Sequence, residues 1–319
     1  MTMISVVMGV YNGASTLAAT LDSIQAQTYD DFECIAVDDG STDDTPRILG
    51  GYASRDPRFQ VITQPNAGLT RALIAGCAAA RGRYIARHDA GDLSDPRRFA
   101  LQIRALDEDA DLAFVSCWTG YAGPDLEPLY IARGAGLSVK PIRIVDLRCE
   151  HGVTDGPTHH GSVMFRRDVY DRISGYRPQF YYGQDWDLWY RLAQAGTFQI
   201  IPEVLYTARI TPNAISNASR TTQQRMAGLS RMALLARSRG ESEASILEEA
   251  ARIQPARGKS RRARANGFYF IGEALRRNGD LRARSYLRRS IAAWPLSIRS
   301  WVRYLQSLLV RSSSRTEVD

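Results

Sequence analysis

The first half of the chain alternates short β-rich runs with stretches of helical periodicity, and this alternation limits the fold more than any other feature. The first run, Ile4–Val10, is apolar and β-branched, as is typical of a buried strand. We expect further strands near residues 32–37, 59–62, 83–87 and 112–117, with helices between them. This pattern predicts an α/β protein with a mostly parallel sheet that is flanked by helices.

Polar residues gather where the predicted strands end. Asp38-Asp39-Gly40-Ser41 follows the second strand, and His88-Asp89-Ala90-Gly91-Asp92 follows the fourth. Ligands of open α/β sheets bind outside the carboxyl ends of the strands. We therefore expect the functional site at this edge of the sheet.

Two clusters at this edge have the chemistry to bind a nucleoside. Val10, Tyr11 and Asn12 lead into a glycine, so a ring that can stack on a base lies beside a turn, although these residues also form routine turns. Asp38 and Asp39 can accept hydrogen bonds from a uracil N–H or from ribose hydroxyls. The structural alternative for these two acids is an Asx turn with a helix cap.

A third cluster, Gln64–Arg71, has features of a phosphate site. Gly68 lies just before a predicted helix, where free N–H groups and the positive end of the helix dipole favour phosphate. Arg71 would then point at the nucleotide. An exposed arginine on the first helical turn is the competing interpretation.

The loop after the fourth strand contains candidate metal ligands. Asp89 and Asp92 are spaced closely enough to hold Mg²⁺ or Mn²⁺ against a diphosphate. His160, just before a buried strand, is the third candidate for the metal or a phosphate. Solvated loop acids and a hydrogen-bonded core histidine are the alternatives.

The segment Gly183–Trp189 has the features of a catalytic base. Asp185 lies before a predicted helix among aromatic residues, which would desolvate its carboxylate and raise its pKa. Such a carboxylate can accept the proton of a sugar hydroxyl, and Tyr182, Gln184 and Trp186 would contact the acceptor. An N-cap role for Asp185 is the structural alternative.

In their order and spacing these motifs resemble family-2 glycosyltransferases over roughly residues 3–205. The resemblance is carried by Ser5-Val6-Val7, Tyr11-Asn12, Ser23-Ile24, Gln27-Thr28-Tyr29, Phe32-Glu33, Val37-Asp38-Asp39-Gly40-Ser41-Thr42-Asp43, Asn66-Ala67-Gly68-Leu69, Gly82-Arg83-Tyr84-Ile85-Ala86-Arg87, Pro96-Arg97-Arg98-Phe99, His160-Gly161-Ser162-Val163-Met164-Phe165-Arg166, Gly175-Tyr176 and Gln184-Asp185-Trp186-Asp187-Leu188.

That resemblance implies a GT-A nucleotide-diphospho-sugar transferase fold, to which the purely helical pattern from about residue 221 onward adds a C-terminal helical appendage. It also implies a UDP-, GDP- or dTDP-sugar donor and inversion at the anomeric carbon. Carried over by position, Tyr11 would lie near the base, Asp39 would bind it, and Asp38 would lie near the ribose. Asp185 would act as the general base.

Two positions depart from the family pattern. The family usually has Asp-x-Asp before the proline-led helix, whereas Gly91 stands at the third position here and Asp92 follows it. The usual Glu-Asp pair at the base is here Gln184-Asp185. We expect activity to survive both changes, with weak or absent metal dependence as one outcome of the first. A nucleotide-sugar-binding protein that has lost catalysis is the alternative.

Charge is distributed unevenly along the chain. The formal net charge is +7, but residues 220–319 contain 21 basic and 8 acidic side chains, which leaves the first 219 residues acidic. We expect a GT-A catalytic domain over residues 1–219 and a basic helical region over 220–319. Within that region Gly272–Pro295 resembles one helical-hairpin repeat of the tetratricopeptide kind.

The last helical segment is amphipathic. Ile298, Trp301 and Leu305 share one face with other apolar residues, and the arginines lie elsewhere. Such a helix can lie on an anionic membrane surface, or its apolar face can pack onto the catalytic domain. Membrane contact would suit a lipid-linked oligosaccharide acceptor in surface-polysaccharide assembly. The basic stretch Lys259–Arg264 has no interleaved aromatic residues, so nucleic-acid binding is not expected.

Two further features bear on location. The sequence shows no secretory signal and no apolar run of about 18 residues, which predicts a cytoplasmic protein, peripheral on the inner face of the membrane if the last helix binds lipid. The four cysteines have no metal-binding spacing, and we interpret them as small buried side chains.

Overall fold

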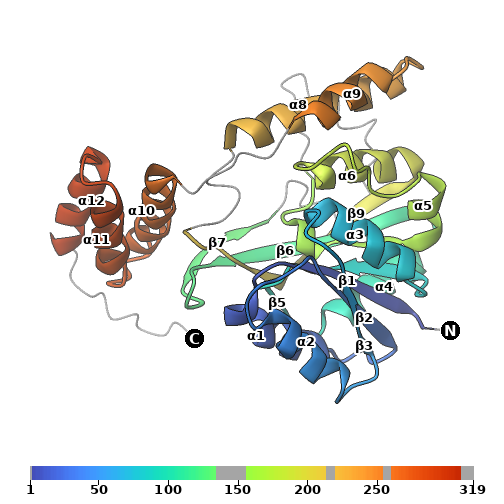
Figure 1. Ribbon diagram of the computed structural model, residues 1–319, viewed down its shortest axis with the longest axis horizontal. Coiled ribbons are helices and arrows are strands. Elements are labelled where there is room, and N and C mark those ends of the chain that lie inside the picture. Colours follow the sequence, from blue (N-terminus) through green and yellow to red (C-terminus); the bar gives the residue numbers. More distant parts are fainter. Residues whose placement is uncertain (1, 134–155, 213–219, 254–259, 310–319) are drawn as a thin grey trace. The chain divides into compact units, whose positions relative to one another are not determined.

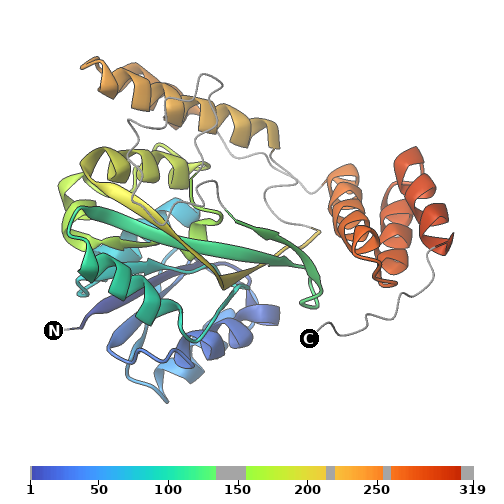
Figure 2. The same cartoon turned by 180° about the vertical axis from the view of Figure 1, so that it is seen from behind.

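The computed structural model describes residues 2–133, 156–212, 220–253 and 260–309. The chain forms two compact units, and both are drawn in Figures 1 and 2. The first contains residues 1–119, 131–208 and 224–254, and the second contains 120–130, 209–223 and 255–319. Helices α8 (Arg220–Ser238) and α9 (Ala244–Arg252) therefore belong largely to the first unit, whereas the boundary expected at residue 219 assigns them to the C-terminal region.

A mixed sheet forms the centre of the fold. Within the described residues its order is β3-β2-β1-β4-β8-β6-β9-β5, and β7 pairs with β6. Parallel pairing joins β3, β2, β1 and β4, whereas β8 is antiparallel to both β4 and β6. The strands are β1 Ile4–Val10, β2 Phe32–Asp38, β3 Phe59–Thr63, β4 Tyr84–Arg87, β5 Leu93–Ser94, β6 Leu112–Ala122, β7 Pro128–Ala132, β8 Met164–Arg166 and β9 Thr197–Arg209.

The positions of the predicted strands are confirmed, and the α/β class with them. The sheet is less parallel than expected, because the segments after residue 112 return as antiparallel strands. The parallel part still contains all four strands whose ends carry the nucleotide and metal candidates.

Helices cover both faces of the sheet, as Figure 1 shows. Alternate residues of β1 point to opposite faces: Val6 and Met8 pack with α1, α2 and α4, whereas Val7 packs with α3, α5 and α6. These helices are α1 Ala14–Gln25, α2 Thr45–Ala53, α3 Leu69–Ala79, α4 Arg98–Glu108, α5 Arg167–Arg172 and α6 Gln184–Ala195.

The second unit contains α10 (Arg261–Arg277), α11 (Ala283–Ala293) and α12 (Ile298–Leu309). Leu129, Phe268, Ile271, Leu275 and Tyr286 form its small apolar core. In that core the Tyr286 hydroxyl donates to the carboxylate of Glu127 over 2.6 Å. The unit thus combines the three helices with the turn between β6 and β7.

Three further expectations concern a helix, the cysteines and membrane-spanning segments. The sequence also predicts a helix over 141–149, and this segment, which ends at Cys149, lies outside the described residues. Cys34, Cys77 and Cys117 are buried free thiols, as expected. In the described part of the chain, no helix combines the length and the apolarity that crossing a bilayer requires.

The close packing of α3 on the sheet yields a stability prediction. A Cβ at Gly76 would lie 2.6 Å from Val7 Cγ1 and 3.2 Å from Val37 Cγ2, so Gly76→Ala should lower the free energy of unfolding by about 1–3 kcal/mol. A Cβ added at Gly50 of α2 would have no atom within 4 Å. Gly50→Ala should therefore leave the free energy of unfolding unchanged or raise it by up to about 1 kcal/mol. Urea unfolding of both variants measures the difference, and equal stabilities would contradict this account.

Candidate active site

The parallel strands bring the predicted polar clusters to one edge of the sheet. The loop after β1 is tied to the loop after β2, because Asp39 N–H donates to the Val10 carbonyl over 2.8 Å. The Thr42 N–H donates to Asn12 Oδ1 over 2.8 Å, and Asn12 adopts a left-handed φ of 51°. Next to this junction, Tyr11 is 54% exposed, so its ring is accessible to a base.

The Asp39 carboxylate organises the loop before α3. Its Oδ1 accepts from Gln64 Nε2 over 2.7 Å and from Ala67 N–H over 2.9 Å, and its Oδ2 accepts from Gly68 N–H over 2.8 Å. The Gly68 N–H, predicted to bind phosphate, is thus donated to Asp39. Gly68 must lack a side chain here, because it has a φ of 89° and a Cβ would lie 2.5 Å from the Tyr181 ring.

Two other donor-site candidates differ in their surroundings. Asp38 is buried at the end of β2, and its Oδ1 accepts from Ser41 N–H over 3.0 Å. This hydrogen bond is the one that an Asx turn makes. Arg71 is exposed on the first turn of α3. Among the described residues it forms no ion pair within 4 Å, so its guanidinium is available to an anion.

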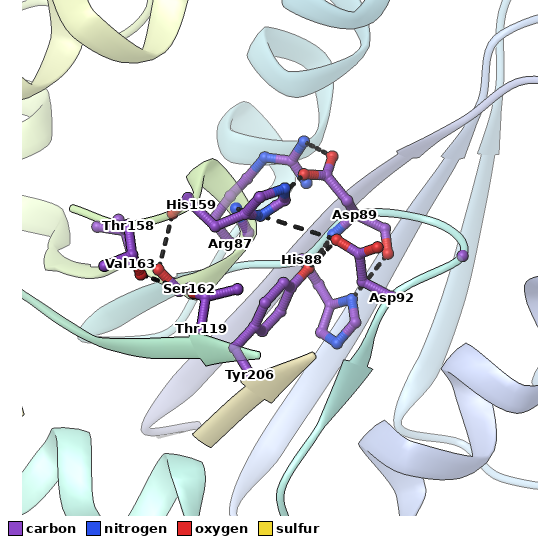
Figure 3. A network of polar contacts seen from close by, with 12 residues as sticks. Arg87, His88, Asp89, Asp92, Thr119, Thr158, His159, Ser162, Val163 and Tyr206 are labelled. Carbon is purple, nitrogen blue, oxygen red and sulfur yellow. Dashed lines mark hydrogen bonds and ion pairs between the residues drawn. The ribbon is translucent and has the colours of Figure 1, made fainter. Parts of the chain in front are cut away.

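Asp89, Asp92 and His159 form the acidic centre of the site. One ligand atom from each lies within 4.8 Å of the others, and Figure 3 shows the three side chains pointing toward one another. His159 Nδ1 lies 3.8 Å from Asp89 Oδ2 and 3.7 Å from Asp92 Oδ2. The Gly161 N–H donates to this Nδ1 over 3.0 Å, so Nδ1 carries a lone pair rather than a proton.

The histidine beside the carboxylates is therefore not the one that the sequence singled out. His160, predicted as a metal ligand, is buried and its Nε2 lies 2.7 Å from the hydroxyl of Tyr176. It is absent from the cluster of candidate ligands among the described residues. The backbone between these neighbours turns into a short 3₁₀ segment at His160, which sends the two imidazoles to different partners.

Tyr206 of β9 holds the acidic centre in place. Its hydroxyl donates to Asp92 Oδ2 over 2.9 Å and accepts from Asp89 N–H over 3.0 Å. Its ring stacks on His159 with centroids 5.3 Å apart. Gly161 lets the tyrosine approach, since a Cβ there would lie 2.0 Å from the Tyr206 hydroxyl.

Buried arginines set the charge of this centre. The Arg87 guanidinium pairs with Asp89 Oδ1; burial alone would raise the pKa of Asp89, but this positive charge holds it well below its usual value. Arg98 is fully buried and donates to the Arg87 carbonyl over 2.9 Å and to Ser94 Oγ over 2.9 Å. Burial and the nearby Arg98 lower the pKa of His88 to about 3, so His88 is neutral.

Asp185 lies in the first turn of α6, where its environment makes it basic. The helix is capped by Gly183, which has a φ of 67°, without a side-chain hydrogen bond, so Asp185 is not the N-cap. Burial raises the pKa of Asp185 to about 6. The hydrogen bond that Trp186 N–H donates to Asp185 Oδ1 lowers this pKa, but by less than burial raises it. Charge on Asp89 adds to this rise, so the two carboxylates interact electrostatically.

The predicted acceptor residues surround Asp185 unevenly. Trp186 is partly exposed and packs edge-on to Trp189 with centroids 5.2 Å apart. Gln184 is buried. Tyr182 packs partly against the cluster that Phe180 forms with α8 and α9. Of the three, Trp186 therefore offers the clearest aromatic surface to a sugar ring.

Sequence reasoning missed four residues of this site: Arg87, Arg98, His159 and Tyr206. The sequence does contain a signal for His159, because this residue stands beside His160, the histidine that the sequence analysis favours. Arg98 lies within the proline-led helix motif, but no local pattern predicts that its guanidinium is buried. Tyr206 had no local signal, since its contact with Asp92 spans 114 residues of chain.

Comparison with known proteins agrees with this geometry. Residues 5–174 match the model of glycosyl transferase family 2. The putative glycosyltransferase EpsE of Bacillus subtilis (strain 168) is 34% identical over 225 residues, which cover 68% of this chain and 77% of that protein. The chondroitin synthase of Escherichia coli is 27% identical over 204 residues, or 64% of this chain and 28% of the synthase.

Solved structures share the fold at low sequence identity. The S. aureus TarS 1-349 structure in complex with UDP-GlcNAc superposes with a TM-score of 0.53 and 14% identity, covering 96% of this chain and 89% of that chain. This likeness supports a GT-A fold for the sheet and its helices. Because the family match extends over more than half of the sequence, the chain belongs to glycosyl transferase family 2 and is a glycosyltransferase.

Proposed function

We propose that the protein is an inverting glycosyltransferase that moves a sugar from a nucleotide-diphosphate donor to a hydroxyl of a glycan or a lipid-linked oligosaccharide. One observation carries this proposal: the carboxyl of Asp185 has a pKa raised to about 6 and interacts electrostatically with Asp89 of the acidic centre. A base close to a centre that can hold a cation against the diphosphate is the arrangement that transfer from a nucleotide sugar requires.

The donor would occupy the edge formed by the ends of β1, β2 and β4. The exposed Tyr11 ring would stack on the base, and Asp38 with Asn12 would border the ribose. Asp39 would act by holding the loop that ends at Gly68, and its Oδ2, which among the described residues accepts only the Gly68 N–H, could accept a second hydrogen bond from the base. Arg71 would contact the phosphates. The solved TarS complexes contain UDP and UDP-GlcNAc, which favours a uridine nucleotide.

In the transfer step, the oxygen of the acceptor hydroxyl forms a bond to the anomeric carbon, and Asp185 accepts the proton that this hydroxyl loses. The bond from that carbon to the diphosphate oxygen breaks at the opposite face, so the configuration inverts. Trp186 would hold the acceptor sugar by its apolar face. The raised pKa of Asp185 suits a base that must be ionised near neutral pH and still attract a proton.

A divalent cation fits the residues of the acidic centre. Carboxylate oxygens and an imidazole nitrogen are suitable ligands for Mn²⁺ or Mg²⁺. Asp89, Asp92 and His159 would hold the ion, with the His159 Nδ1 lone pair exchanging the Gly161 N–H for the metal. Such an ion neutralises the negative charge that develops on a departing nucleoside diphosphate. Asp92 and His159 would compensate for Gly91, which has a φ of 105° and no carboxylate.

The acceptor belongs to polysaccharide assembly in this proposal. Chondroitin synthases and a hyaluronan synthase of Pasteurella multocida are among the relatives, although the chain spans only 20% to 28% of their lengths. A lipid-linked acceptor would place the enzyme at the inner face of the cytoplasmic membrane.

Replacing the base provides the first test. Asp185→Asn should lower kcat about 10²- to 10⁴-fold, while the donor Kd changes less than about threefold because Asp185 contacts the acceptor. Nucleoside diphosphate release and donor calorimetry measure the two quantities. Asp44→Asn, at an exposed residue that pairs only with Arg47 in the described chain, is the control. A full rate in Asp185→Asn would remove Asp185 from the mechanism, whereas donor binding without turnover in the unmodified chain would favour a donor-binding protein that has lost catalysis.

The pH profile provides a second test. Because Asp185 must be deprotonated and its pKa is about 6, kcat/KM should rise as pH increases from about 5 to about 7 and then level off. The rising limb should disappear from the residual activity of Asp185→Asn. A limb near pH 6 that persists in this variant would assign the titration to another group.

Metal binding can be tested without turnover. His159→Gln should weaken Mn²⁺ binding about tenfold or more in the presence of UDP, because a ligand atom is lost. His160→Gln, at the neighbour that bonds Tyr176, should change it by less than about twofold. Calorimetric titration measures both affinities. A larger loss in His160→Gln would return the ligand role to His160.

A further inference from the structure

Helix α12 presents its apolar face outward and its polar face inward. Ser300 and Ser307 are 0% and 2% exposed against the rest of the second unit. Ile298 is 78% exposed and Leu305 is 58% exposed. The same outward face includes Trp301, Val302 and Leu308, which are 46%, 44% and 48% exposed. A helix that folds only to complete a core has the opposite arrangement.

Polar contacts fix this orientation. Ser300 Oγ lies 2.9 Å from Ser290 Oγ, which in turn donates to the Ala265 carbonyl over 2.8 Å. At the other end of the helix, Arg284 Nε donates to the Ser307 carbonyl over 3.1 Å. Rotating α12 to bury its apolar side would break these buried hydrogen bonds, so the outward apolar face is a property of the folded unit.

The apolar face continues into the segment before the helix. Leu296 is 78% exposed and Trp294 is 36% exposed. Trp301 Nε1 donates to the Pro295 carbonyl over 2.9 Å, which satisfies the indole N–H and leaves an apolar ring on the surface. We call this outward apolar surface the α12 face; it consists of Trp294, Leu296, Ile298, Trp301, Val302, Leu305 and Leu308. Tryptophan with aliphatic neighbours is typical of surfaces that enter the boundary between headgroups and acyl chains.

The unit that carries the α12 face is strongly cationic. Residues 260–309 contain eleven arginines and only two acids, Glu273 and Asp280. Both acids are already paired with arginines. Arg288, Arg289 and Arg299 form no ion pair with any described residue. A second copy of the same surface would be repelled, whereas anionic lipid would be attracted to these basic residues.

We propose that the α12 face binds the headgroup region of an anionic bilayer, with the helix lying along the surface. Ile298, Trp301 and Leu305 enter the boundary of the acyl chains, and the surrounding arginines contact lipid phosphates. This binding depends only on the second unit and not on the transfer reaction, so it stands or falls separately from the proposed enzyme activity.

Cosedimentation of the full chain with vesicles tests the inference. Vesicles containing phosphatidylglycerol should bind the protein, pure phosphatidylcholine vesicles should bind it at least about tenfold more weakly, and roughly 0.5 M salt should reduce the difference. Ile298→Ser with Leu305→Ser should weaken binding to the anionic vesicles about tenfold or more. Met232→Ser, at a 52% exposed apolar residue of α8, is the matched control and should bind like wild type.

Fluorescence locates the contact. Anionic vesicles should shift the tryptophan emission to shorter wavelength, and Trp301→Phe should reduce that shift while keeping most of the binding. Equal binding to neutral vesicles, or full binding by the Ile298→Ser/Leu305→Ser variant, would overturn the proposal.

Two results would assign the α12 face to another occupant and also overturn the proposal. The first is self-association that the double variant abolishes, which would show a contact between copies. The second is a melting temperature several degrees lower in that variant, which would show packing against the rest of the chain. Because binding is measured without donor, a chain that binds vesicles but releases no nucleotide would overturn the proposed function alone.

Discussion

The parallel pairing of β1 with β2 and β4 is the constraint on which the site depends. In this register Val10 lies beside Asp38 and Val7 lies beside Arg87, so the polar loops after three strands open at one edge. Backbone and side-chain hydrogen bonds then join the loops across that edge. Groups from distant parts of the sequence can contact one bound nucleotide because the sheet has already brought their backbones together.

Burial acts on the carboxylates of this edge with opposite outcomes. Removing Asp185 from water raises its pKa to about 6. Asp89 experiences the same desolvation, but the buried guanidinium of Arg87 outweighs it and holds the pKa low. One carboxylate is thereby suited to receive a proton and the other to remain an anion. Environments that separate pKa values in this way commonly distinguish acid–base groups from charge-binding groups.

The acidic centre shows how a changed motif keeps its chemistry. Gly91 takes a left-handed φ of 105°, which a carboxylate-bearing residue would adopt only with strain. The neighbouring Asp92 turns into the centre instead, where Tyr206 fixes its carboxylate. His159 adds the third candidate ligand atom. The metal-binding capacity of the loop thus depends on β9 and on the segment before β8 as much as on the loop itself.

The sequence by itself determined the strands, the helices and the family, because hydrophobic periodicity and turn residues act over a few neighbouring positions. It also indicated Asp185, whose aromatic neighbours are local in the chain. Only the tertiary structure decided that His159 rather than His160 joins the acidic centre, that Tyr206 reaches Asp92, and that α12 turns its apolar face outward. These choices depend on backbone direction and on contacts between residues far apart in the chain, which packing and buried hydrogen bonds select and which no local pattern encodes.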